Sequence, residues 1–539
     1  MSRNLDLRNP LYALPNQLRC INSRKGQSSV ESIIANGLPY SRRLHSHTSC
    51  VNALAFSSGD GRFLASGGDD LRLRLWDTHQ DDLTQPSINL HGATGNIFTI
   101  AFSAQNRYIY SGGVCEAVFR YDISTLGETP VSQSPQASHF DQEGSIRSVS
   151  CHPFNEDIVL SASEDGTVVR YDARDSDTRT RRWRRDASES NTSALRLKVE
   201  LASALYHPTI SHLFLTADTR GKVCLRDERM IFGNSSREEN GGIVRTYNTK
   251  LTKRSVQHLS NPEVSSVAFD QDGSRFALTL QHYLPTIYAT EDPHPIAVCS
   301  GKIWPNGEPV TPGQKSYSNA CTMKHGSFGS LGTNSDQYYG AGSDDFCAYL
   351  WKIPSISELK DQRKEINPLD WWTKETSDTT AFTDGFSQPK FIPVDLSRPH
   401  CRLTGHISIV NSVEFHPQFL HVATSGVEKD IILHSPTPGS PCTRDLEPTP
   451  TEVRALPDNN EEDRLSYFRA LFGAFSEADR DENRTISMFD YIVRQEGDRN
   501  IFEIRKWRPD PADNEDEEPD PDDDSTDANS SSEDDTTYS

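Results

Sequence analysis

The sequence has no CxxC pair, no long apolar run and no recognisable secretion signal. Its 10 cysteines lie at least 22 residues apart, which argues against zinc knuckles and thioredoxin-type motifs and favours reduced thiols. No stretch approaches the roughly 18 apolar residues that a membrane helix needs, and the first 20 residues lack the apolar core of a signal peptide. We therefore expect a soluble protein of the nucleus or cytoplasm that makes no membrane contact.

Signatures of catalysis are also missing. The sequence contains no P-loop, GxSxG, HExxH or dinucleotide-binding motif, so it predicts no enzyme, catalytic residue, metal site or cofactor. The glycine-rich stretch GSFGSLG, residues 326–332, lacks the Lys-Ser/Thr of a P-loop and is interpreted as a loop between strands. An enzyme built on the predicted fold would need acidic or histidine side chains that converge in one cleft.

Hydrophobic residues make up only 34% of the chain, and the net charge is -22. Residues 510–539 contain 14 Asp or Glu and no Lys, Arg or His, which leaves -8 for the remainder. Such a self-repelling tail is typical of disorder. The mildly acidic remainder has no basic excess with which to neutralise phosphates, so general nucleic-acid binding is not expected.

A repeated pattern occupies the remainder of the chain. SGGDDLRLRLWDT (66–78), SGGVCEAVFRYDI (111–123), SASEDGTVVRYDA (161–173), TADTRGKVCLRDE (216–228) and AGSDDFCAYLWKI (341–353) each predict a strand, a tight turn and a second strand. A weaker copy at 278–290 and a final copy at 423–435 bring the count to seven. The equivalent strand ends are Trp76, Tyr121, Tyr171, Arg226, Ala289, Trp351 and His434.

A further half-buried strand precedes most copies, as in CVNALAFS (50–57), IFTIAFS (97–103) and IVNSVEFHP (409–417). The repeating unit is therefore four strands. A closed ring of such sheets hides their faces against one another and leaves only short edges. We predict an all-β fold, a seven-bladed β-propeller over residues 44–436. Residues 1–43 form an N-terminal extension, 437–509 a linker with a helical appendage, and 510–539 the acidic tail.

The motifs LWD at 75–77, GSDD at 342–345 and LTGH at 403–406 make this pattern similar to the WD-repeat family. In that family a loop His, a turn Asp and the strand-end Trp share a hydrogen-bonded network that fixes the blade. The resemblance implies this structural role, rather than a catalytic one, for a small set of residues. The set is His47, Asp70, Trp76, Asp345, Trp351 and His406, with Glu428 as a further partial match.

Three His-Pro pairs begin at His152, His207 and His416, at the same place in three repeats. Metal ligation is one interpretation, but a metal site needs further ligands that converge on it. Proline holds the preceding residue extended and starts a turn, so turn formation is the interpretation that we adopt.

Two consecutive repeats end with the same short motif. RYDAR places Asp172 and Arg174 after Tyr171, and LRDER places Asp227 and Arg229 in the equivalent positions of the next repeat. A single exposed arginine is explained by solvation and a local Asp partner. Recurrence in neighbouring blades would present two planar guanidinium groups on one rim, which suits bidentate docking onto another protein.

This pair resembles the double DWD box of WD-repeat substrate receptors for cullin-4 RING ubiquitin ligases. Long stretches at 50–77, 319–328, 338–354 and 403–436 are similar to the cullin-4-associated factor usually numbered five. In this sequence Tyr171 and Arg226 replace the box tryptophans, and a buried Arg226 would need a polar partner.

The resemblance implies a substrate-recognition adaptor whose partner-binding residues are Tyr171, Asp172, Arg174, Asp227 and Arg229. These residues would face the ligase's adaptor propeller and, through it, the cullin and RING subunits, while another surface holds an unidentified protein substrate for ubiquitination. The alternative is a WD-repeat scaffold of another assembly that has no ligase attached.

Three segments outside the repeats carry open interpretations. SSVESIIANG (28–37) predicts a short helix, which either frays or, as in the receptor family, inserts into the adaptor. Five arginines between 179 and 185 form either a solvated loop or a site for nuclear import or an acidic partner. The apolar spacing of Leu465, Phe468, Leu471, Phe472 and Phe475 predicts one face of a helix, part of a helical appendage between 461 and 507 that packs on the ring or on itself, or binds a partner.

Overall fold

The computed structural model describes residues 30–124, 138–174, 194–232, 241–256, 258–332, 335–373, 379–457, 465, 482–497 and 499–503. The chain divides into two compact units, residues 1–501 and 502–539, and the architecture below is that of the first unit. The arginine cluster at 179–185, the acidic tail and most of the expected helix between 461 and 481 lie outside the described residues.

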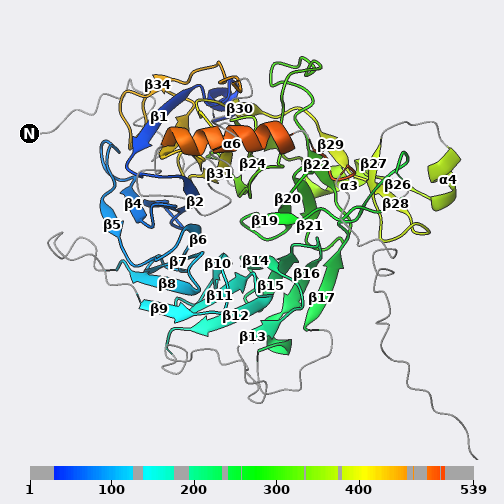
Figure 1. Ribbon diagram of the computed structural model, residues 1–539, viewed down its shortest axis with the longest axis horizontal. Coiled ribbons are helices and arrows are strands. Elements are labelled where there is room, and N and C mark those ends of the chain that lie inside the picture. Colours follow the sequence, from blue (N-terminus) through cyan, green and yellow to red (C-terminus); the bar gives the residue numbers. More distant parts are fainter. Residues whose placement is uncertain are drawn as a thin grey trace, which may run out of the picture. The chain divides into compact units, whose positions relative to one another are not determined.

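The described residues form eight sheets, of which seven are arranged as the blades of a propeller (Figure 1). Each blade has four or five strands, ordered outward from the central axis. The first four blades are β2 (Val51–Phe56), β3 (Phe63–Gly68), β4 (Leu73–Asp77), β5 (Ile88–Leu90); β6 (Ile97–Phe102), β7 (Tyr108–Gly113), β8 (Ala117–Asp122), β9 (Ser138–Asp141); β10 (Ile146–Cys151), β11 (Ile158–Ser163), β12 (Thr167–Asp172), β13 (Ala194–Arg196); and β14 (Leu201–Tyr206), β15 (Leu213–Asp218), β16 (Val223–Asp227), β17 (Ile243–Tyr247).

The remaining three blades carry the insertions and the ring closure. Their strands are β19 (Val264–Phe269), β20 (Arg275–Leu280), β21 (Thr286–Ala289), β22 (Ala297–Cys299), β29 (Val394–Leu396); β23 (Ser327–Gly329), β24 (Tyr338–Gly342), β25 (Ala348–Lys352), β30 (Cys401–Leu403); and β31 (Val410–Phe415), β32 (Val422–Gly426), β33 (Asp430–Ser435), β1 (Tyr40–His45), β34 (Glu447–Pro448). The innermost strands of the seven blades contact one another in order, and β31 contacts β2. The predicted all-β, seven-bladed propeller is therefore confirmed.

An N-terminal strand closes the ring. Strand β1 pairs antiparallel with β33 from Tyr40 opposite Ser435 to His45 opposite Asp430, so the two ends of the propeller share its seventh blade. The propeller begins at Tyr40, ahead of the expected boundary at residue 44, and β34 extends the same sheet beyond residue 436. A register of six residue pairs ties the ring together non-covalently, because alternate pairs of an antiparallel register exchange backbone hydrogen bonds.

Two details differ from the sequence-based expectation. GSFGSLG contains β23, the innermost strand of the sixth blade, rather than a loop. Glycine is required there because a Cβ at Gly329 would lie 2.1 Å from the ring of Phe415. In the fifth blade the register pairs Phe276 with Tyr288, so Tyr288 occupies the strand-end position that was expected for Ala289.

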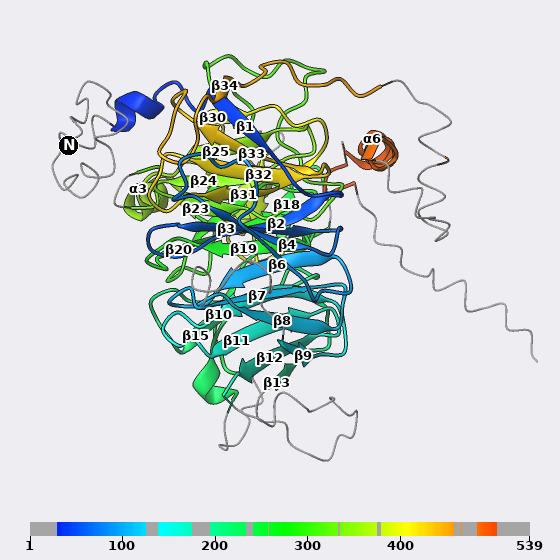
Figure 2. The same ribbon diagram turned by 90° about the vertical axis from the view of Figure 1, so that its left-hand side faces the viewer.

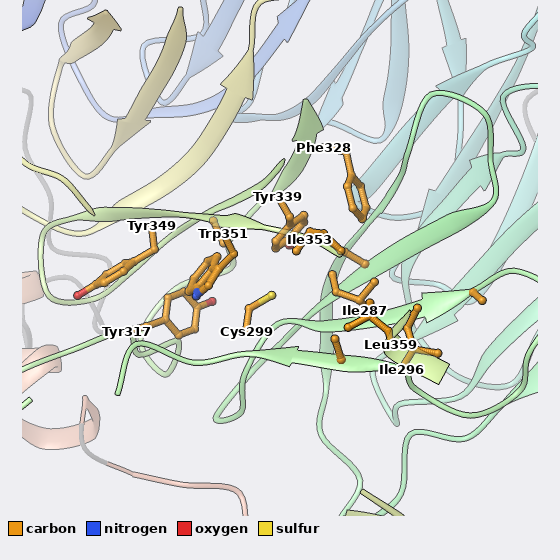
Figure 3. Packing of buried hydrophobic residues seen from close by; sticks show 14 of the residues in the cluster. Ile287, Ile296, Cys299, Tyr317, Phe328, Tyr339, Tyr349, Trp351, Ile353 and Leu359 are labelled. Carbon is orange, nitrogen blue, oxygen red and sulfur yellow. The ribbon is translucent and has the colours of Figure 1, made fainter. Parts of the chain in front are cut away.

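Aromatic side chains fill the space between the fifth and sixth blades. The rings of Trp351, Tyr349 and Tyr317 pack against one another, and the centre of the Trp351 ring lies 5.7 Å from that of Tyr349 and 5.5 Å from that of Tyr317 (Figure 3). All three are buried, together with Cys299 and Leu359. Close packing of these large rings contributes to the apolar burial that holds the fifth and sixth blades together.

An insertion forms a small eighth sheet on the outside of the ring. It comprises β18 (Leu251–Lys253), β27 (Thr380–Phe382), β28 (Lys390–Ile392) and β26 (Lys364–Ile366), flanked by helices α3 (Ile356–Gln362) and α4 (Pro368–Thr373). The insertion returns through β29, which pairs in parallel with β22 of the fifth blade. The insertion is therefore anchored to the blade edge by backbone hydrogen bonds.

The propeller has two faces. We call the end where the first and third strands of each blade finish the box face, because Arg174 and Arg229 lie there. A helical turn over residues 30–34 packs on this face: Lys352 Nζ is 3.3 Å from Glu31 Oε1, and the Ile34 carbonyl lies 2.9 Å from His400 Nε2. In Figure 2 this turn and α3 lie on the left, and helix α6 (Glu482–Glu496) lies on the right.

Helix α6 covers part of the opposite end, which we call the helix face. Its first residue, Glu482, accepts a hydrogen bond of 3.1 Å from the backbone N–H of Lys429, in the turn between β32 and β33. Asp490 pairs with Arg454 at 2.6 Å, and Val493 is buried in a cluster that includes Ile409. The predicted appendage therefore packs on the ring; of its expected apolar stripe, only Leu465 lies among the described residues.

Candidate partner-binding face

The third strand of each of the first four blades ends at an Asp that shapes the turn that follows. The side chain accepts a hydrogen bond from the backbone N–H two residues further on, at 2.9 to 3.1 Å. The four pairs are Asp77 with His79, Asp122 with Ser124, Asp172 with Arg174, and Asp227 with Arg229. This geometry is an Asx turn, so the recurrent Asp has a structural role in every one of these blades.

The arginines distinguish the third and fourth blades. Arg174 donates to Asp172 from Nε at 2.9 Å and from Nη2 at 2.7 Å. Arg229 does the same to Asp227, at 3.0 and 2.6 Å. These bonds lower the pKa of both aspartates, since each stabilises the carboxylate.

In the first two blades the equivalent Asp is paired from a different position. Arg62 pairs with Asp77 at 3.1 Å and Arg107 with Asp122 at 3.6 Å, and both arginines come immediately before the second strand. The third and fourth blades have Asp157 and His212 at that place. In the third and fourth blades the arginine that pairs with the Asp therefore comes two residues after it, in the turn that follows the third strand.

The two boxes lie side by side on one face. Innermost strands β10 and β14 run in the same direction, because Ser148 contacts the Ala204 carbonyl and Ser150 accepts from the N–H of Tyr206. Glu228, between Asp227 and Arg229, joins the blades: its carboxylate lies 3.4 Å from Arg170 Nε and accepts from the Tyr206 hydroxyl at 2.9 Å.

Both box arginines point to solvent while they hold their aspartates. The side chain of Arg174 is 61% exposed and that of Arg229 is 65% exposed. A guanidinium has five N–H donors, and the fork to the Asp uses the Nε edge. Nη1 and the outer side of Nη2 therefore remain directed away from the blade, in an orientation that is fixed by the Asp.

The residues at the tryptophan positions of the boxes are buried. Tyr171 packs in the third blade, and its hydroxyl lies 3.3 Å from the Asp141 carbonyl. Arg226 is 2% exposed and donates to Thr216 Oγ1 at 2.8 Å and to the Gly241 carbonyl at 2.6 Å. Burial lowers the pKa of Arg226. The polar partners that this position requires are therefore present, and neither side chain reaches the surface.

The residues expected to share a structural network meet in the first blade. His47 Nδ1 lies 3.0 Å from Asp70, His47 Nε2 lies 2.8 Å from Ser66 Oγ, and Trp76 Nε1 donates to Ser66 at 3.0 Å. Arg74 adds a contact of 2.6 Å to Asp70. Burial alone would raise the pKa of Asp70, but His47 and Arg74 outweigh it and leave the pKa at about 2.

The seventh blade builds a variant of this network with other residues. His406 contacts Glu428 through Nδ1 and Thr424 Oγ1 through Nε2, the latter at 2.7 Å, and His434 takes the tryptophan position 2.9 Å from Thr424. Burial, followed by the nearby positive charges, lowers the pKa of His434 well below its ordinary value.

The sixth blade does not join its two expected residues. Asp345 accepts from the Tyr349 hydroxyl at 2.6 Å and from Arg402 at 3.2 Å. Trp351 Nε1 instead donates to the Ser300 carbonyl at 2.9 Å. Asp345 and Trp351 therefore stabilise the blade through separate contacts.

The His-Pro pairs act as turn caps. His152 Nδ1 accepts from the N–H groups of Phe154 and Asn155 at 3.1 and 3.0 Å, and His207 and His416 make the same type of contact. No group of three or more His, Cys, Asp or Glu that could hold a metal occurs among the described residues. None of the helices that the structure describes could cross a membrane.

Two apolar side chains beside the boxes were not singled out from the sequence. Phe154 is 63% exposed and Ile210 is 38% exposed. They belong to the turns after His152 and His207, at the ends of β10 and β14, and so lie on the box face of the same two blades. The available signal was an apolar residue one or two positions after a His-Pro pair, where solvent-facing polar residues are expected.

Comparisons with known proteins agree with this architecture. Residues 39–77 and 133–172 match the family model described as WD domain, G-beta repeat; the first segment contains β1 to β4 and the second includes β9 to β12. The two segments therefore lie in the ring closure and in the blades around the first box.

Several curated proteins are similar over longer stretches. DDB1- and CUL4-associated factor 5 of Mus musculus and of Homo sapiens are each 28% identical over 413 residues, which cover 76% of this chain and 35% of the relative. Protein ALTERED SEED GERMINATION 2 of Arabidopsis thaliana is 33% identical over 150 residues, 27% of this chain and 19% of the relative. The chain thus spans about a third of the length of the first two relatives.

Proposed function

We propose that this chain, which matches the WD repeat in two segments and is similar to DDB1- and CUL4-associated factor 5, is a substrate receptor of a cullin-4 RING ubiquitin ligase. In this role it binds the adaptor DDB1 through the box face and presents a protein substrate for ubiquitination. It acts by binding, with no chemistry of its own. Its place of action is the nucleus or cytoplasm.

The observation that carries the proposal is the pair of pre-oriented guanidinium groups in adjacent blades. Arg174 and Arg229 are exposed, each is held by its own Asp, and Glu228 fixes one box against the other. Rigid, exposed arginine forks favour bidentate contacts with carboxylates or carbonyls of a partner, because little side-chain entropy remains to be lost on binding.

Apolar and helical features on the same face support a docking role. Phe154 and Ile210 add hydrophobic contact area beside the two arginines, and interfaces combine such an apolar centre with charged groups. The helical turn over residues 30–34 lies on this face as well, with Val30 and Ile34 buried against the ring. Those two side chains hold the turn in place, and its exposed side stays available to DDB1.

The test is co-purification of DDB1 with the full chain that carries Arg174→Ala and Arg229→Ala. We expect DDB1 recovery to fall at least about 100-fold, because each lost charge-assisted contact weakens binding by about tenfold or more. The matched control is Arg62→Ala with Arg107→Ala, which removes two similar ion pairs from the same face of the first two blades.

The control should retain DDB1. Undiminished recovery with Arg174→Ala and Arg229→Ala would contradict docking through the boxes. If the unmodified chain recovers no DDB1 but a different stable assembly, the protein is instead a WD-repeat scaffold without ligase association.

A further inference from the structure

The seven innermost strands enclose an axial channel of about 330 Å³. Much of its wall consists of hydroxyl side chains that are already bonded within the ring. Ser148 donates to the Ala204 carbonyl, Ser327 to Val413 and Ser412 to Asn52. These groups stabilise the ring and have little capacity left for a ligand.

Glu414 differs from the rest of the wall. Among the described residues that line the channel it is the only carboxylate, and no described side chain makes a hydrogen bond or ion pair with it. Burial raises its pKa from 4.5 to about 8. A partly buried carboxylate without a partner among the described side chains is costly to ionise, and a cation placed beside it would remove that cost.

The channel is asymmetric along its axis. Glu414 is the fifth residue of β31, and the equivalent residues of β14 and β19 are Leu205 and Ala268, which leave an apolar surround near the box face. Arg147 and His325 stand at the other end of the channel, where Arg147 pairs with Glu164 and lies 5.6 Å from the Phe98 ring.

Arg147 and His325, at the helix-face end of the channel, determine which charge a ligand in the channel can carry. Burial, followed by the charge of Arg147, lowers the pKa of His325 to about 4, so that His325 is neutral at about pH 7 and Arg147 carries the positive charge. An anion that approaches Arg147 would have to compete with Glu164, which already pairs with this arginine. A cation near the box face would instead find the Glu414 carboxylate with no partner among the described side chains. The free binding capacity of the channel is therefore for one positive charge, close to the box face.

We propose that the mouth of the channel on the box face binds an alkyl cation, the lysine or arginine side chain of a partner protein, with Glu414 as its counter-ion. The alkyl stem packs against Leu205, Ala268 and Phe269, which line the same end. The inference stands apart from the proposed ligase role, because it depends on the channel and not on the boxes.

A protein side chain fits better than a free polyamine. A polyamine carries several positive charges along its length and binds tightly where several carboxylates follow one another. The channel supplies one carboxylate, and Arg147 repels a second ammonium group that reaches further in. A single cation at the end of an alkyl chain matches both features.

The experiment is calorimetric titration of the full chain with Nα-acetyl-lysine methylamide and, separately, its arginine analogue. A ligand of this size at ordinary ligand efficiency has a Kd of about 1 mM. We expect Glu414→Gln to weaken binding at least about tenfold. The exposed Glu452→Gln serves as the matched control and should bind like the unmodified chain. The stronger of the two probes identifies the side chain.

A second readout follows the proton. At about pH 7 Glu414 is mostly protonated, because its pKa is raised to about 8, so cation binding should release a proton, measured from the heats in two buffers of different ionisation enthalpy. Without ligand, the unmodified chain should lose stability as the pH rises from 4.5 to about 8, because the folded state holds the proton more tightly than the unfolded state. Glu414→Gln should lack this loss.

Absence of binding to both probes well above about 1 mM would overturn the proposal, as would equal binding by Glu414→Gln. Tighter, Glu414-dependent binding of spermidine would overturn the assignment to a protein side chain. DDB1 recovery by Glu414→Gln is a separate measurement, so the channel site and the boxes can fail independently.

Discussion

Replacement of Asp70 by Asn tests whether the first-blade network holds the propeller together. The side chain of Asp70 is 2% exposed and contacts His47, whose side chain is fully buried, and Arg74, which is 8% exposed. The Asp70→Asn substitution would keep the size of the side chain and remove its charge. Arg74 would then remain buried without a carboxylate.

The structure gives the size of this effect in two ways. Loss of one member of a buried ion pair costs about 3–5 kcal/mol, because the other charge stays desolvated. The shift in the pKa of Asp70, from 3.8 to about 2, corresponds to about 2 kcal/mol of preferential stabilisation of the carboxylate. We therefore expect Asp70→Asn to lower the free energy of unfolding by about 2–5 kcal/mol.

The assay is urea unfolding at about pH 7, with Asp77→Asn as control. Asp77 also pairs with an arginine, Arg62, but that side chain is 48% exposed, and an exposed pair contributes at most about 1 kcal/mol. In the unmodified chain the Asp70 contribution is present above pH 3.8 and is lost as the pH falls through about 2. Equal shifts of the urea midpoint for the two variants would refute the reasoning.

Two further predictions concern stability. His416 and His434 have pKa values well below the ordinary 6.5, because both are buried. On acidification the unfolded chain therefore takes up these protons at a higher pH than the folded chain does. Below about pH 6.5 the free energy of unfolding, measured by urea unfolding, should fall by up to about 1.4 kcal/mol per pH unit for each histidine. His434→Gln should make this fall shallower, and an unchanged slope would contradict it. Leu44 is fully buried in the closing strand β1. Leu44→Ala should lower the free energy of unfolding, measured by urea unfolding, by about 2–5 kcal/mol. A loss below about 1 kcal/mol would show that β1 adds little to closure of the ring.

Most of the fold could be predicted from the sequence because the repeat is local. Alternating apolar residues define each strand, and glycine and aspartate mark the turns within about 13 residues. Such patterns can be read from the sequence wherever apolar and polar residues alternate regularly along a strand. The GSFGSLG stretch was misinterpreted because it is rich in glycine, and the ring of Phe415 fills the space that a side chain at Gly329 would otherwise occupy.

The candidate site was only partly visible in the sequence. The spacing of Asp172 to Arg174 and of Asp227 to Arg229 is local, and the Asx turn that joins each pair follows from it. The position of one box beside the other depends on Arg170 and Glu228, residues of different blades. Phe154 was overlooked because its exposure depends on the fold around its turn.

What the sequence by itself determined is the blade: strand periods, turn residues and the short-range pairs that lie within one repeat. Only the tertiary structure decided how the ring closes through β1, and that Arg226 finds its partners in Thr216 and Gly241. It also decided that Glu414 faces a channel whose described side chains give it no partner. The physical reason is that burial, and with it the cost of a charge, depends on residues that are distant in the chain and meet only when the ring is complete.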